Sequence, residues 1–79
     1  MKKGEIWICK FDDVTVFPDV QSYGDIHLIK KGEEVRIIKT SADMEEYKEH
    51  DEIYLRAPGV YFWFPRKLFL KCFEYHSES

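Results

Sequence analysis

Short apolar segments, separated by turn signals roughly every 8–12 positions, most constrain how this chain can fold. Residues 5–11, 34–40 and 52–56 are rich in β-branched and aromatic side chains, and in 34–40 and 52–56 apolar and polar positions alternate. Residues 60–64 are entirely apolar and end at Pro65. Since successive side chains of a strand point to opposite faces, these segments are expected to form strands.

Turn residues separate these segments. Lys31-Gly32 and Ala57-Pro58-Gly59 favour tight turns, because glycine accepts positive φ and proline suits the first corner. A long loop over 12–25 is expected to contain a short irregular strand, followed by a strand over 25–30. Residues 68–73 are interpreted as the last strand, after a tight bend at 65–67, and 77–79 are expected to fray. The polar stretch 41–51 is expected to form either a loop or a single helical turn at 42–48.

These elements predict an all-β fold, a small barrel of about five or six short antiparallel strands. The 79 residues suffice for one domain, 1–79, with a core over about 5–75. Aromatic residues are 16% of the chain, which gives a small core large buried areas. No segment has the apolar length of a membrane span, and two cysteines are too few for a disulfide scaffold, so a cytoplasmic protein is expected.

Acidic residues are concentrated between Ser41 and Glu52, a segment that we call the acidic loop. The net charge is −3, but the acidic loop carries most of the excess and leaves the rest slightly basic. A calcium loop needs a central glycine, and this segment has none. A solvated loop and a docking site for a basic partner both remain open. The members proposed for such docking are Asp43, Glu45, Glu46 and Glu49.

The aromatic run 60–64 predicts a candidate binding surface. Its residues cannot all face one core, so one pair should point outward or lie under a loop. Exposed aromatic rings beside cations would suit a peptide or single-stranded nucleic acid. The candidate surface consists of Tyr23, Tyr61, Trp63, Arg66, Lys67 and Lys71.

Residues able to support catalysis are scattered. Cys9 and Cys72 lack the close spacing of a zinc motif and are interpreted as packing residues. His27 has Asp25 two positions before it, and this pair is interpreted as a surface pair. No catalytic site, metal or cofactor is therefore predicted, and the protein is not expected to be an enzyme.

The order of signals resembles that of SH3 domains over about residues 5–73. Matching segments are 28–37, with Lys-Lys-Gly-Glu-Glu at its centre, then 53–56, then 63–68, which begins with Trp63-Phe64-Pro65. The resemblance implies an SH3-like barrel whose final strand follows a single 3₁₀ turn. It does not extend to the binding of proline-rich peptides. The SH3 domains that bind them carry Trp and Tyr near the positions that Ile53 and Leu68 occupy here.

The opening Met1-Lys2-Lys3-Gly4-Glu5-Ile6-Trp7 is similar to that of MazF-type toxin endoribonucleases. That resemblance covers about ten residues. The family's first loop carries a catalytic arginine, and this chain has no arginine before Arg36.

The leading functional hypothesis is a non-catalytic protein-interaction module, of the kind found in small prokaryotic or phage regulators. A protein partner, no membrane, and a monomer or weak homodimer are expected. A nucleic-acid-binding barrel using Lys30, Lys31 and the cations at 66–71 is the first alternative. The second is a MazF-like ribonuclease, active or inactive, for which Arg36 or His27 would be needed.

Overall fold

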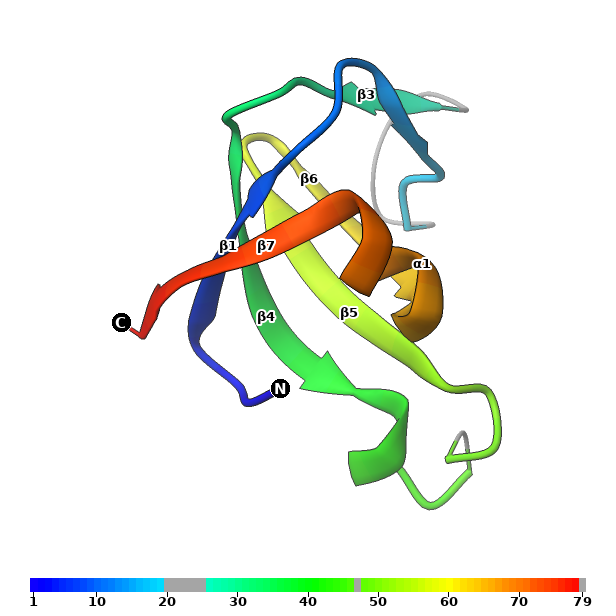
Figure 1. Ribbon diagram of the computed structural model, residues 1–79. Helices are drawn as coiled ribbons and strands as arrows, with labels where there is room; N and C mark the ends of the chain where they lie inside the picture. Colours follow the sequence, from blue (N-terminus) through cyan, green and yellow to red (C-terminus); the bar gives the residue numbers. More distant parts are fainter. Residues whose placement is uncertain (20–25, 47, 79) are drawn as a thin grey trace.

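The computed structural model describes residues 1–19, 26–46 and 48–78. Seven strands within these residues form two antiparallel sheets, with one short α-helix and one 3₁₀ turn (Figure 1). The larger sheet has the order β6-β5-β4-β1-β7, and β2 pairs with β3 in a smaller one. The predicted all-β class is confirmed, with seven strands in place of five or six.

The strands follow the segments that the sequence indicates. In chain order they are β1 (Glu5–Cys9), β2 (Val14–Val16), β3 (His27–Ile29), β4 (Glu34–Thr40), β5 (Glu52–Ala57), β6 (Val60–Pro65) and β7 (Phe73–Glu78). The β5–β6 turn has Gly59 at φ +77°, a conformation that side chains with a Cβ rarely adopt. The 3₁₀ turn η1 spans Ser41–Asp43, so helical structure begins one residue earlier than the predicted turn at 42–48 and ends sooner.

The prediction for 68–73 is wrong. Arg66–Cys72 form a helix, α1, and the last strand begins only at Phe73. The physical reason is a tertiary contact: Phe69 is fully buried and packs against Trp7 of β1, with ring centroids 4.7 Å apart, and it also stacks on Phe73 at 5.0 Å. Arginine, lysine and leucine around them are good helix formers, which a strand interpretation ignores. Ser77, expected to fray, instead pairs with Ile6 in the sheet.

All seven strands and α1 contribute residues to the core. Alternate positions of β5 and β6 point into it, which explains why Phe62 and Leu55 are fully buried while their neighbours are not. The buried hydrophobic residues are Cys9, Val16, Ile29, Val35, Ile37, Ile53, Leu55, Ala57, Val60, Phe62, Phe64, Phe69 and Phe73.

The sheet does not close into a barrel. Among the described strands, β6 and β7 are its edges, and α1 connects them in sequence and contacts both (Figure 1). Phe69 of α1 packs against Trp7, with centroids 4.7 Å apart, so the helix fills space that strand pairing would otherwise occupy. The segment after β2 lies along the β6 edge, where the Asp19 amide donates to the Tyr61 carbonyl at 2.8 Å.

Candidate ligand-binding face

The side of β4, β5 and β6 that points away from the core carries aromatic and cationic side chains. We call it the outer face, and its members are Arg36, Lys39, Tyr54, Arg56, Tyr61 and Trp63. Phe62 and Phe64 are buried, and strand alternation therefore turns Tyr61 and Trp63 outward. The predicted outward pair of the 60–64 run is thus Tyr61 and Trp63.

Cross-strand register brings the three aromatic rings of the outer face together. Tyr54 lies opposite Trp63 in the β5–β6 pair, and their ring centroids are 4.9 Å apart. Tyr61 stacks on the other side of Tyr54 at 6.0 Å, with the ring planes 18° apart. Such contacts fix the rings in place before any ligand arrives, which lowers the entropy lost on binding.

A bulge in β4 places Lys39 on the same face. The register shifts between Ile37 and Lys39, so Lys39 lies opposite Tyr54 although Ile37 points into the core. Its Nζ lies 5.1 Å from the Tyr54 ring centroid and 5.6 Å from that of Trp63. A cation therefore sits beside the aromatic rings without a salt bridge to any described residue.

Asp19, which follows β2, contributes a carboxylate at the border of the outer face. The Tyr54 hydroxyl donates a hydrogen bond to Asp19 Oδ2 at 2.7 Å. Partial burial and this neighbouring carboxylate raise the pKa of Tyr54 to about 12. The hydroxyl stays protonated at neutral pH, and the bond ties the chain before residue 20 to the rings.

A hollow of about 410 Å³ lies at one end of the outer face, between Trp63 and the acidic loop. Met44, His50 and Glu52 line it with Trp63, and the buried hydroxyl of Ser41 accepts from the Glu52 amide at 2.8 Å. This bond fixes the start of β5 against the 3₁₀ turn. The predicted acidic members Asp43, Glu45, Glu46 and Glu49 are all exposed nearby in sequence.

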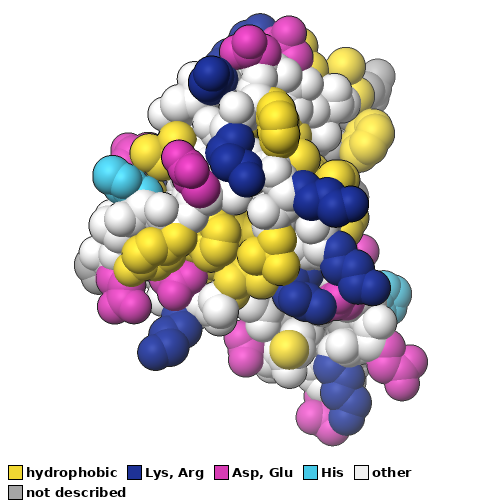
Figure 2. All heavy atoms as spheres, in the orientation of Figure 1, with side chains coloured by type: hydrophobic (Ala, Val, Ile, Leu, Met, Phe, Trp, Pro, Cys, Tyr) yellow, Lys and Arg dark blue, Asp and Glu magenta, His cyan; other side chains and the backbone are white. Residues whose placement is uncertain are grey.

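The cations predicted for the candidate surface lie apart from its aromatic members. Lys67 and Lys71 are exposed on α1, whose Phe69 packs on the core side, whereas Tyr61 and Trp63 point to the opposite side. Figure 2 shows Lys and Arg side chains gathered on the right of that view, over α1. Tyr23 lies outside the described residues.

Arg66 is engaged in an ion pair. Its guanidinium donates to both carboxylate oxygens of Asp51, at 2.6 and 3.2 Å. These bonds lower the pKa of the Asp51 carboxyl. Arg66 therefore joins the end of the acidic segment to the start of α1 and is not a free cation of the predicted patch.

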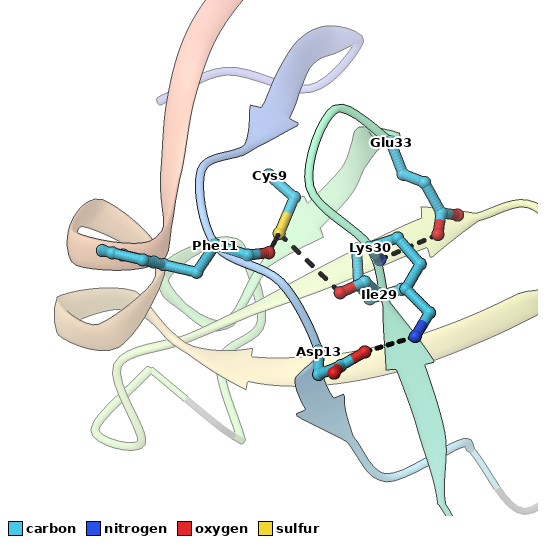
Figure 3. A network of polar contacts seen from close by, with 6 residues as sticks. All are labelled: Cys9, Phe11, Asp13, Ile29, Lys30 and Glu33. Carbon is cyan, nitrogen blue, oxygen red and sulfur yellow. Dashed lines mark hydrogen bonds and ion pairs between the residues drawn. The ribbon is translucent and has the colours of Figure 1, made fainter.

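The two cysteines lie on different elements, Cys9 at the end of β1 and Cys72 at the end of α1. Cys9 is buried, and its thiol donates to the carbonyls of Phe11 at 3.1 Å and Ile29 at 3.9 Å (Figure 3). Burial raises the pKa of this thiol, which disfavours the nucleophilic thiolate. Figure 3 also shows that the Lys30 ammonium group donates to the Asp13 carboxylate and that the Lys30 backbone amide donates to the Glu33 carboxylate. These bonds hold the segment after β1 against the segment after β3.

Cys72 ends α1 and lies next to Phe73, the residue opposite Cys9 in the sheet. No cluster of three metal-ligating side chains occurs within the described ranges. Asp25, the partner considered for His27, lies outside the described residues. Within residues 1–19, 26–46 and 48–78, no helix has the length and apolar character to cross a membrane.

The predicted candidate surface contains only two of the six members of the outer face, Tyr61 and Trp63. Tyr54 and Arg56 stand two apart in an alternating strand, and that spacing already placed them on the face opposite Leu55. Lys39 could not be found in this way, because strict alternation assigns it to the face of Val35 and Ile37. The bulge that reverses this assignment has no glycine or proline to mark it in the sequence.

In comparisons with protein-family models, curated proteins and solved structures, the chain finds no match. The geometry alone therefore defines its class, which is a small all-β protein with an aromatic and cationic sheet face.

Proposed function

We propose that this chain is a non-catalytic protein-interaction module of SH3-like type that binds its partner through the outer face. The observation that carries the proposal is the ordered group of Tyr54, Tyr61 and Trp63, with Lys39 beside two of the rings. Tryptophan, tyrosine and arginine are the residues that most often dominate interface energies, and here they share one side of a rigid sheet.

Two further features support this proposal. Tyr61 is 41% exposed although it is large and aromatic, and the adjoining hollow is of a size that takes one or two side chains. The resemblance to SH3 domains implies a single 3₁₀ turn before the final strand, and the chain instead has the seven-residue helix α1 at this place.

Single-stranded nucleic acid is the second candidate ligand, because stacked rings beside lysine and arginine also suit bases and phosphates. Lys39 and Arg56 are the observations that favour it. This candidate would be identified by a binding constant that falls steeply with salt concentration. The slope of log K against log salt concentration should then be smaller by about one unit in the Lys39→Gln chain.

The proposed function predicts that Trp63→Ala weakens partner binding by about 30-fold or more, the loss typical of an interface hot spot. The purified chain is used to capture partners from cell extract, each partner is identified, and its affinity for the two chains is then measured. Tyr75→Ala is the matched control, since Tyr75 is a 52% exposed aromatic residue on β7. Partners that bind the Trp63→Ala chain as tightly as the original chain would disprove the proposed function.

A further inference from the structure

Two arginines lie directly opposite each other on the outer face. Arg36 of β4 and Arg56 of β5 are register partners in the sheet, and both are exposed. Like charges at directly opposed positions of an antiparallel pair destabilise the sheet. Folding alone therefore gives no reason for this pair.

Neither arginine is neutralised within the described part of the chain. The ion pairs there join Lys30 to Asp13, Lys48 to Glu45 and Arg66 to Asp51. The guanidinium of Arg56 lies 5.7 Å from the Tyr61 ring centroid. That contact positions Arg56 but leaves its donors free for hydrogen bonds.

A hollow of about 290 Å³ lies over this pair. Both arginines line it, together with Ile6, Ala57, Pro58 and Glu34. Apolar groups thus form part of its wall, where a bound anion would lose some contact with water and be attracted more strongly. Glu34 is the only carboxylate among the described residues that line the hollow, and it forms no ion pair with either arginine.

We infer that Arg36 and Arg56 bind carboxylates of an acidic segment of the partner protein. The inference rests on the proposed function and specifies the chemistry of the ligand at the same face. The planar guanidinium fork matches a carboxylate through two parallel hydrogen bonds, and two forks side by side can hold adjacent acidic side chains. The rings of Tyr61 and Tyr54 then lie beside the segment as apolar contacts.

Charge distribution favours a short acidic segment over a nucleic acid. The chain carries a net charge of −3, and the exposed acidic loop lies beyond the opposite end of the outer face. A long polyanion that crossed the face past Trp63 would approach Glu52 and the acidic loop. A short segment contacts the arginines and avoids those carboxylates.

The test is a titration of the full chain with a hexaglutamate peptide at low salt, followed by nuclear magnetic resonance of backbone amides and arginine Nε–H groups. Saturable shifts are expected at Arg36 and Arg56, and the affinity should fall at least tenfold in the Arg36→Gln/Arg56→Gln chain. The control Lys67→Gln/Lys71→Gln removes the same charge from α1 and should change the affinity less than twofold. Equal losses in the two variants, or no shifts at the arginines, would overturn the inference.

Two additional measurements distinguish this inference from its alternatives. Removing the like-charge pair should leave the unfolding midpoint unchanged or raise it, and a lowered midpoint would indicate a structural role instead. Hexathymidylate is expected to bind more weakly than hexaglutamate. If hexathymidylate bound more tightly at the arginines, the ligand of this site would be a nucleic acid and the inference would be wrong.

The failure of the inference and the failure of the proposed function give different results. If a partner no longer binds the Trp63→Ala chain but still binds the Arg36→Gln/Arg56→Gln chain, the proposed function stands and the carboxylate site is disproved. If the partner binds both variants as tightly as the original chain, the proposed function and the carboxylate site are both disproved.

Discussion

Replacing Phe62 with alanine is expected to destabilise the fold by about 3–5 kcal/mol, because a fully buried ring is lost and leaves a cavity at the centre of the core. The Phe62 ring packs edge-on against Phe64, with centroids 6.1 Å apart. A domain of this size has a free energy of unfolding of only about 4–12 kcal/mol. Urea denaturation followed by far-ultraviolet circular dichroism should therefore show a much lower midpoint, or a chain already largely unfolded in buffer.

Tyr61→Ala is the matched control for this prediction. Tyr61 precedes Phe62 in β6 and points outward, so its removal creates no cavity and should cost about 1 kcal/mol or less. A loss of equal size in the two variants would show that β6 does not separate a core face from an outer face.

Replacing Phe69 with alanine is expected to cause a loss of similar size, about 3–5 kcal/mol. Its ring is fully buried and contacts both Trp7 and Phe73, so it joins α1 to β1 and to the last strand. The measurement is again the free energy of unfolding in urea. Trp7 fluorescence should also change, since its nearest ring neighbour is removed.

Leu68→Ala and Leu70→Ala are the controls for α1. Both side chains are 44% exposed, and each substitution should cost less than about 1.5 kcal/mol. If either substitution matched the loss at Phe69, the burial of one face of α1 would be disproved.

The strands were largely predictable from the sequence. The sequence alternates between apolar and polar positions in 34–40 and 52–56, and the structure has strands there. Gly59, a predicted turn residue, has the positive φ that such a turn requires. The helix Arg66–Cys72 was not predictable by the same argument, since apolar runs of this length fit a strand and a helix equally well. Phe69 decides between them only through Trp7, which is 62 positions away in the sequence.

The candidate site was predictable in part, for a related reason. Alternation places Tyr61 and Trp63 on one side of β6, and this follows from the sequence once the strand is recognised. The cations that accompany them depend on register between strands. Sequence proximity suggested Lys67 and Lys71, whereas pairing brings Arg56 to Tyr61 and the β4 bulge brings Lys39 to Trp63.

The assembly of Lys39, Tyr54 and Trp63 on one outward side is the claim on which the proposed function depends. Nuclear Overhauser effects between their side chains test it most directly. The structure predicts contacts from the Lys39 methylene protons near Nζ to both rings, with those protons shifted upfield by the rings. Contacts from Lys39 to the buried side chains of Leu55 or Phe62 instead would place it in the core and contradict the account.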